Sequence, residues 1–515
     1  MSSLALSGLA FGRHAYAATG IDYLARQTFD DLDREFHSGD WVGQPGNPND
    51  DTVTGKSGDL AWGQSYVLIG LLRMYEAYRD THYLDRFVAN ADLVLSMRDS
   101  ERGVTDYRGL SLPAWRANHP YTVGTVTLTD AGGKPILEVR IGRVYCNSTT
   151  VTVSSGSAPG LFTLLVVHAQ SGSRQTFANL SMDPASPNYA VRRLYDAYPG
   201  AVLVTGRDVR QAPAPEDIPV NGRFQMQSLP GIFAVHTGMI TYPMASFVRI
   251  VQSSPTLRSN PLYGAKAKEY LAAVRDAVAV HDPEWRENAS GGYLIWVKGS
   301  PQQWDGCEQP INQSLGLGQT LAELAVITDD PTYRHRASAL AAMFRAELAV
   351  DADDAYTWHY WPTYSRVYTG FDKTGSPDTD VSLYNPNLRT PQRQIEDLSH
   401  GAISLDFAVR AFRNHLGLDG QDMARLARTF THNLAATRNE RATAFVRLNG
   451  TGGPDLNYAY QAPRWAPIAW WDPTIHDHSL AIYNDNQPTA ESLQTLPGWL
   501  LGTIAHLQWF ARRDA

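Results

Sequence analysis

Cysteine is scarce in this chain: Cys146 and Cys307 are the two that occur among its 515 residues. Two cysteines are too few for a disulfide framework or a structural zinc site, and the sequence leaves open whether they pair with each other. Basic residues are also outnumbered, with 44 Lys and Arg against 52 Asp and Glu and a net charge of -8. Phosphate binding requires a concentrated basic surface, so we expect no nucleic-acid partner.

Long apolar runs and cofactor motifs are missing as well. After the signal-like amino terminus no run of about 18 apolar residues occurs, so we expect no membrane-spanning helix. No glycine-rich phosphate loop stands between a strand and a helix, and neither H-E-x-x-H nor G-x-S-x-G is present. We therefore expect no cofactor and no metal ion. A content of 43% hydrophobic and 19% charged residues is that of an ordinary globular protein.

The amino terminus has the character of the end of an export signal. Residues 2–10 are small and apolar, and Ala15-Tyr16-Ala17 has the small-x-small pattern of a cleavage site. We interpret residues 1–18 as the remnant of a signal peptide and predict a secreted or periplasmic protein. A disordered apolar tail is the alternative.

Most of the chain carries the periodicity of amphipathic helices, and the helices occur in pairs joined by a few polar residues. The predicted helices are 64–78, 84–97, 264–280, 312–327, 333–348, 400–416, 421–434 and 498–511. Pairs open near Gln64, His236, Asn312, His400 and Arg464, and the last four openings are spaced by roughly 65 to 90 residues. We predict a mainly α protein in which helical hairpins close into an (α/α) toroid. An open α-solenoid is the alternative, although its repeats are usually shorter and more regular.

A segment of different character interrupts the helices. Between Tyr121 and Val209, short alternating runs such as Thr125–Thr129 and Phe162–Val167 are separated by Gly, Ser and Pro, which predicts strands. We interpret this segment as a β-rich domain inserted into a loop of the helical domain. The predicted division is residues 1–18 signal remnant, 19–119 first part of the toroid, 120–212 inserted domain and 213–515 remainder of the toroid.

Polar residues gather where the inner helices are predicted to begin. Capping explains Asp397, whose carboxylate can accept from free helix N–H groups. Capping does not explain His236, His400 and Arg464, because positive charge is disfavoured at a helix N-terminus. A neutral imidazole with a lowered pKa would suit a proton acceptor there, whereas a structural role is the alternative for either histidine. The amides Gln64, Asn312 and Gln313 occupy equivalent openings and are candidates for substrate binding.

Aromatic residues crowd the polar connections between these helices. The chain has 13 Trp and 25 Tyr, and aromatic faces pack against the C–H faces of sugar rings. We expect some of them to bind sugar and the others to fill space between hairpins. The candidates for sugar contact are Trp304, Trp361, Trp465 and Trp471.

Three segments carry a resemblance to known enzymes: His236-Thr237-Gly238-Met239, residues 356–362 (YTWHYWP) and residues 396–401 (EDLSHG). With the predicted helical hairpins, they resemble toroidal polysaccharide lyases and the helical domain of glucuronyl C5-epimerases. The resemblance implies that Asn312 and Arg464 neutralise the carboxylate of a uronate. It also implies His236 or His400 as the base that removes the C5 proton. Tyr242, Tyr360 or Tyr364 would be the acid, and the sequence does not choose among them.

The predicted function is therefore cleavage of a uronate-containing polysaccharide by β-elimination. A glycoside hydrolase is the principal alternative, because Glu396 or Asp397 could act as an acid with Asp305 or Glu308 as the second carboxyl. A uronate C5-epimerase and a non-catalytic glycan-binding protein are further alternatives. The expected partner is a polysaccharide or oligosaccharide, while the sugar, the linkage and the oligomeric state stay open.

Overall fold

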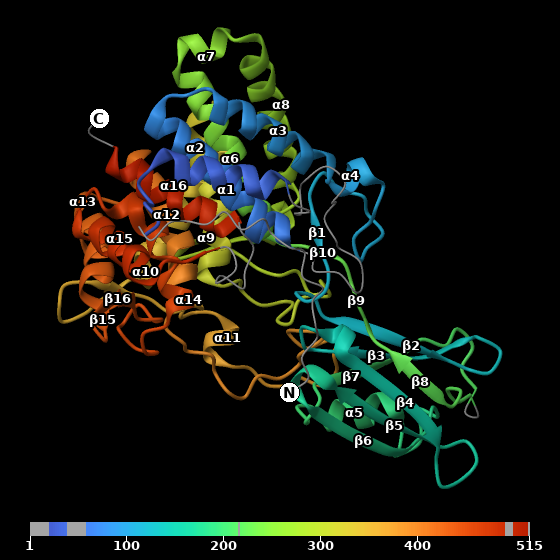
Figure 1. The fold of residues 1–515 in the computed structure, drawn as a ribbon. Helices are drawn as coiled ribbons and strands as arrows, with labels where there is room; N and C mark the ends of the chain where they lie inside the picture. Colours follow the sequence, from blue (N-terminus) through green and yellow to red (C-terminus); the bar gives the residue numbers. More distant parts are fainter. Residues whose placement is uncertain (1–19, 39–57, 215–216, 490–497, 513–515) are drawn as a thin grey trace.

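The computed structural model describes residues 20–38, 58–214, 217–489 and 498–512. Residues 1–18, interpreted as a signal remnant, lie outside the described residues. A helical part and a β-rich part are distinct in Figure 1. Among the described residues, none of the helices combines the length and hydropathy that a membrane span requires.

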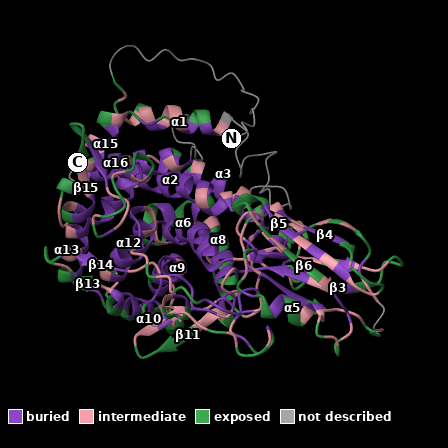
Figure 2. Ribbon diagram, turned by 90° about the horizontal axis from the view of Figure 1, so that it is seen from below, coloured by how far each residue is buried: buried purple, intermediate pink, exposed green. Residues whose placement is uncertain are grey.

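The helical part is organised around elements that contact each other in cyclic order, which we call the inner ring. Its members, each in contact with the next and the last with the first, are α2 (Ser65–Tyr78), α6 (Ala234–Ser253), α9 (Ile311–Ile327), α12 (Leu398–Arg413), η6 (Ala462–Ile468) and α16 (Gly498–Ala511). These helices are buried over most of their length (Figure 2). Their residues are apolar or small on nearly every face, as a helix enclosed by neighbours requires.

Small residues let the inner helices approach closely. A Cβ atom added to Gly238 on α6 would lie 2.1 Å from the backbone oxygen of Gly316 on α9. A contact that short is impossible for any residue with a side chain, so the two helices pack backbone to backbone at this point. The second turns of α6 and α9 are thereby held in one register.

Each inner element is covered from outside by a second helix. The outer helices are α3 (His82–Ser96) on α2, α8 (Pro261–Ala279) on α6, α10 (Pro331–Glu347) on α9, α13 (Gly420–Arg428) on α12, α15 (Thr474–Asn486) on η6 and α1 (Arg26–Ser38) on α16. Their exposed faces are polar, and α8, α10 and α13 begin with a side-chain cap. In α10, for example, Asp330 Oδ1 accepts from the N–H of Thr332 at 2.9 Å and Pro331 is the first helical residue.

Short elements connect these layers. They are η1 (Leu60–Gln64), α4 (Asp99–Arg102), α7 (Pro255–Ser259), η4 (Asp282–Glu284), β11 (Trp285–Asn288), β12 (Gly291–Leu294), β13 (Ala349–Val350), β14 (Tyr356–Thr357), α11 (Arg366–Thr369), η5 (Thr429–Leu434), β15 (Ala435–Arg438), β16 (Arg441–Ala444) and α14 (Leu456–Ala459). The strand pairs β11–β12, β13–β14 and β15–β16 are antiparallel.

The β-rich part consists of two four-stranded sheets, ordered β7-β3-β2-β9 and β6-β5-β4-β8. Its elements are β2 (Gly124–Thr129), β3 (Pro135–Ile141), η2 (Cys146–Ser148), β4 (Thr149–Ser155), β5 (Phe162–His168), η3 (Ala169–Ser171), β6 (Ser173–Leu180), α5 (Ala190–Asp196), β7 (Val204–Asp208), β8 (Gly222–Gln225) and β9 (Gln227–Ser228). Alternate residues of β5 are buried, and a separate apolar core fills the space between the sheets. The chain leaves and re-enters the helical part through the pair β1 (Arg116–Ala117) and β10 (Gly231–Ile232).

The predicted end of this insertion at residue 212 is too early. Strands β8 and β9 lie beyond it, and they pair with β4 and β2 at the edges of the two sheets. Both are short, and their sequence alternates: Phe224 and Met226 face the core of the β-rich part, while Arg223, Gln225 and Gln227 are exposed. The pairing of their backbones with the sheet edges, together with this burial, shows that they belong to the inserted domain.

Cys146 and Cys307 are both buried and unpaired. Cys146 belongs to the core of the β-rich part, whereas Cys307 packs with Trp296 and Trp361 in a cluster beside the helical part. The question that the sequence left open is answered: the two residues do not form a disulfide.

Candidate active site

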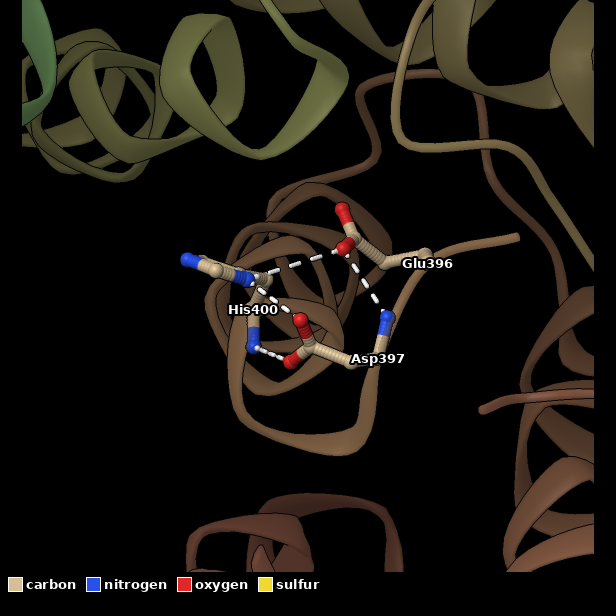
Figure 3. A group of neighbouring side chains, drawn as sticks. All are labelled: Glu396, Asp397 and His400. Atoms are coloured by element: carbon tan, nitrogen blue, oxygen red, sulfur yellow. Dashed lines mark hydrogen bonds and ion pairs between the residues drawn. The ribbon is translucent and has the colours of Figure 1, made fainter. Parts of the chain in front are cut away.

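The carboxylate of Asp397 caps helix α12 and orients His400 at the same time. Its Oδ1 accepts from the backbone N–H groups of Ser399 at 3.0 Å and His400 at 2.9 Å, which are free at the start of the helix. Its Oδ2 accepts from Nδ1 of His400 at 2.7 Å. The cap predicted from the sequence is present, and the same carboxylate also fixes the imidazole (Figure 3).

The outer nitrogen of His400 points away from both carboxylates (Figure 3). The side chain is 39% exposed, and Nε2 has no hydrogen-bond partner within the part of the chain that the structure describes. Because Nδ1–H is donated to Asp397, Nε2 carries the lone pair of the neutral ring. The pair therefore offers a positioned proton acceptor to a ligand.

The charges around His400 oppose the prediction made for it. Burial would lower the pKa of the imidazole, but the hydrogen bond to Asp397 and the charges of Glu396 and Asp397 outweigh burial and raise it. The expectation of a lowered pKa is wrong for His400, because it considered the helix terminus without the two carboxylates. Burial likewise works against ionisation of Asp397, but bonding to His400 lowers its pKa to about 2.

Glu396 has the opposite electrostatic state to its neighbour. Its side chain is completely buried, Oε1 accepts from the N–H of Asp397 at 3.0 Å, and Oε2 has no partner among the described residues. Burial raises the pKa of Glu396 to about 8; the positive charge of His400 works against this and the Asp397 carboxylate adds to it. At neutral pH Glu396 is therefore mostly a neutral acid beside an ionised one.

Other elements bring further side chains to this group. The Tyr360 ring meets the His400 ring edge-on at 5.5 Å, and the carbonyl of Tyr360 accepts from the N–H of Ile311 at the start of α9. Burial raises the pKa of Tyr360, while a hydrogen bond with Gln313 opposes the rise. Arg464 of η6 donates from Nη1 to the carbonyl of Ser399 at 3.0 Å.

Arg447 belongs to this group and was missed in the sequence. Its Nη1 donates to the carbonyl of Ile395 at 2.9 Å and lies 3.9 Å from Asp397 Oδ2. The backbone of Leu398 also donates to Val446 and that of Leu448 to Glu396. Arg447 lies between Val446 and Leu448 in a loop after β16 that has no helical or strand periodicity, so no local signal marks it.

The structure does not bring His236 to this group. His236 Nε2 accepts from Nε1 of Trp62 at 2.9 Å, and its ring stacks on Phe233 at 4.9 Å with Tyr121 edge-on at 5.2 Å. It is 3% exposed, and burial lowers its pKa to about 3. The pKa is lowered as expected, but the acceptor nitrogen is already used, so a role as base is not supported by this geometry.

Tyr242, Tyr364 and Trp471 also lie elsewhere. Tyr242 accepts hydrogen bonds from Arg410, which is about 15 Å beyond His400 along α12 at 1.5 Å per residue. Trp471 packs against Phe412 near the same far end of that helix. The ring centroids of Tyr364 and Tyr293 are 5.2 Å apart. Burial together with the charge of Glu347 raises the pKa of Tyr364. Of the three candidate acids, the contacts therefore leave Tyr360.

The predicted binding residues have different surroundings. Gln64 donates to Asn90 and is 1% exposed, and Asn312 is also 1% exposed. Trp465 is completely buried and donates from Nε1 to the carbonyl of Leu398 at 3.0 Å, so it holds the start of α12 and has no free face for a sugar.

The remaining candidates are more varied. Trp361 is 5% exposed and packs against Trp296, so sugar stacking is not supported for it either. Gln313 and Trp304 are half-buried and stay predictions.

The carboxylate partners considered for hydrolysis are committed to other contacts. Asp305 accepts from the N–H of Gly299 at 2.7 Å and that of Leu383 at 3.1 Å. Glu308 accepts from Arg366 at 2.9 Å and 3.0 Å. Neither carboxyl is free to face Glu396 across a substrate.

Glu396, Asp397 and His400 have donor atoms within 4.8 Å of one another, a spacing that a metal ion could use. A cation at this point would have to displace the proton on Nδ1 of His400, which is bonded to Asp397. The free nitrogen, Nε2, faces away from the two carboxylates (Figure 3). The donor set therefore fits a proton-transfer group better than a metal site, and the absence of a metal stays a prediction.

Comparison with known proteins adds little. No protein-family model and no curated protein matches this chain. Among solved structures, one that is similar to it is a family 76 glycoside hydrolase from a bovine Bacteroides thetaiotaomicron strain. The likeness has 10% identity, covers 76% of this chain and 99% of the other, and has a TM-score of 0.29. A likeness of this degree carries no argument about activity, so function is argued from the site.

Proposed function

We propose that this protein is a carbohydrate-active enzyme with an (α/α)-toroid domain, and that it cleaves a uronate-containing polysaccharide by β-elimination. The observation that carries the proposal is the Asp397–His400 pair at the start of an inner helix, with Nε2 of His400 free and partly exposed. The cyclic contacts of the inner ring support the toroid.

The proposed reaction uses His400 as the neutral imidazole and Tyr360 as the protonated phenol. Nε2 of His400 takes the C5 proton of the uronate, the electron pair forms the C4–C5 double bond, and the C4–oxygen bond breaks. Tyr360 gives its hydroxyl proton to the leaving oxygen, and its raised pKa keeps that proton available. A carbon acid beside a carboxylate requires the negative charge to be offset. Arg447, whose side chain is 34% exposed beside Asp397, is the cation placed to do so, and the more deeply buried Arg464 adds to the positive potential.

A glycoside hydrolase is the second candidate, and the pKa values of Glu396 and Asp397 favour it. A carboxyl with a pKa of about 8 beside one of about 2 is the division of acid and base that hydrolysis requires. The geometry opposes it: the two carboxyls have oxygens within 4.8 Å, closer than the ~5 Å or more that a substrate between them needs. Both oxygens of Asp397 also already accept hydrogen bonds, one from the start of the helix and the other from His400.

The test is an assay on a panel of uronate polymers. Elimination produces unsaturated uronates that absorb in the ultraviolet, whereas hydrolysis produces new reducing ends without that absorbance. Epimerisation releases no product but exchanges the C5 hydrogen with solvent deuterium, and a glycan-binding protein retains affinity without either change.

The residue assignment is tested with His400→Gln. We expect it to reduce turnover by about 10²-fold or more, the usual contribution of a general base. The matched control is His335→Gln on the outer helix α10, where the imidazole is 64% exposed and pairs with Glu287. Full activity in His400→Gln would refute the proposed base whichever product forms. Export is proposed from residues 1–18. It is tested separately by expressing the protein with its native amino terminus and measuring whether it collects outside the cytoplasm.

A further inference from the structure

A charged cluster lies inside the inner ring, in the half away from His400. Arg410 on α12 lies 3.2 Å from Glu323 on α9, and Arg249 on α6 donates to the other oxygen of Glu323 at 2.9 Å. Arg73 on α2 donates to Glu76 at 2.9 Å. Three inner helices thus each contribute an arginine to one interior region.

The charges of this cluster do not cancel. Three guanidinium groups face two carboxylates, so one positive charge is in excess. Arg73 and Arg410 are 5% and 7% exposed and Glu323 is 0% exposed, whereas the side chains of Arg249 and Glu76 at the edge of the cluster are 27% and 19% exposed. A buried charge without a counter-charge is strongly unfavourable. The next charged residues on α12, Asp406 and Arg413, interact with the same arginines and contribute one charge of each sign, so the excess remains.

Two hydrogen-bond donors in the cluster also lack an acceptor. The hydroxyl oxygen of Tyr242 accepts from Nε and Nη2 of Arg410, both at 3.1 Å, so its own proton must be donated elsewhere. The structure gives it no acceptor among the described residues. Nε of Arg73 is buried and likewise has no hydrogen-bond partner among the described residues. Buried donors are rarely left unsatisfied.

Both donors border one small pocket. Its charged and polar lining consists of Arg73, Glu76, Tyr242, Ser246, Arg249 and Arg410, and its volume is about 10 Å³. That space admits one water-sized atom. The enclosed space is too small for a phosphate or a sugar, and the remainder of the pocket is open to solvent.

We propose that this pocket binds a single monatomic anion, with chloride as the physiological occupant. Chloride supplies the one negative charge that the cluster needs and accepts from the Tyr242 hydroxyl and from Arg73 Nε. It also links α2, α6 and α12 through their side chains, so its binding stabilises the inner ring. The site is separate from the Glu396–His400 group and does not rest on the proposed function.

The direct test uses bromide, which replaces chloride and scatters anomalously. Crystals of the full chain soaked in sodium bromide should give an anomalous peak between Tyr242 and Arg73. Density without an anomalous signal, which would be a water molecule, or an empty pocket would overturn the proposal.

The second test measures thermal unfolding in sodium chloride and in sodium gluconate at equal ionic strength. We expect chloride to raise the unfolding temperature with saturation, because it binds the folded state. Tyr242→Phe removes one donor and should require at least tenfold more chloride for the same rise. Tyr263→Phe, whose hydroxyl donates to Asp85 outside the pocket, is the matched control. If Tyr242→Phe does not fold, Arg249→Gln replaces it, since that side chain is 27% exposed. Equal unfolding temperatures of the wild type in the two salts would refute the proposal.

Discussion

The most informative perturbation of the candidate site is Glu396→Gln, because it tests the burial of that carboxyl without assuming any activity. The pKa of Glu396 is about 8 in the folded protein, against 4.5 for an ordinary glutamate. A raised carboxyl pKa means that the folded state holds the proton more tightly than the unfolded state. The contribution of this proton to the free energy of unfolding is fully present below about pH 4.5 and is lost as the pH rises to about 8.

The size of the effect follows from the same values. Each pH unit in this window corresponds to about 1.4 kcal/mol, so the wild type should lose about 5 kcal/mol from Glu396 between pH 4.5 and pH 8. Glu396→Gln has no proton to lose and should lack this slope. Asp397 keeps its bond to His400 in both proteins. The charge of Glu396 contributes to the raised pKa of His400, so the difference between the two proteins reports the coupled Glu396–His400 pair.

The assay is urea unfolding at pH 5, 6, 7 and 8, with the free energy of unfolding compared at each pH. Relative to the wild type, the free energy of unfolding of Glu396→Gln should rise by up to about 1.4 kcal/mol for each pH unit. Glu440→Gln, in the exposed turn between β15 and β16, is the matched control and should run parallel to the wild type. Parallel curves for Glu396→Gln would show that the carboxyl is ionised in the folded protein, and the argument for a neutral acid would fail.

Three further predictions test separate parts of the structure. Asp397→Asn keeps an oxygen for the helix cap but cannot accept a hydrogen bond from His400 Nδ1. Turnover should therefore fall by about 10²-fold or more, while the far-ultraviolet circular dichroism spectrum stays unchanged. Activity within twofold of the wild type would contradict a catalytic role for the Asp397–His400 pair. Gly238→Ala places a Cβ 2.1 Å from a backbone oxygen of α9 and should destabilise by about 1–3 kcal/mol or more in urea unfolding; Gly420→Ala, with nothing within 4 Å, is its control. Trp465→Phe should lower the free energy of unfolding by about 1–2 kcal/mol, because the buried indole loses its bond to Leu398; a loss of sugar affinity at unchanged stability would instead support the original binding role.

Much of the architecture could be predicted from local sequence patterns. Apolar periodicity located α2, α3, α9, α10 and α12, because each helix buries a face and the pattern repeats within one segment. Alternation located the longer strands of the β-rich part for the same reason. The predicted domain stopped before β8 and β9, which are short edge strands, although Phe224 and Met226 alternate with polar residues there.

The candidate site was only partly accessible in this way. Asp397 and His400 are three residues apart at a helix start, so their contact follows from local geometry. The contact of Tyr360 with His400 joins a loop to a helix and depends on how the ring closes. Equivalent positions in two hairpins suggested equivalent roles for His236 and His400. Burial lowers the pKa of His236, whereas the hydrogen bond to Asp397 and the neighbouring carboxylates outweigh burial and raise the pKa of His400.

Sequence alone determined the helical pairs, the interrupting strands and the cap that begins α12, because each depends on residues within one or two turns of each other. The tertiary structure decided which polar residues are free to act. Burial and partners from distant elements made Glu396 a neutral acid, occupied the acceptor of His236, enclosed Trp465 and directed Tyr242 into a charged interior. Desolvation and long-range pairing depend on the whole packed ring, and no single segment contains that information.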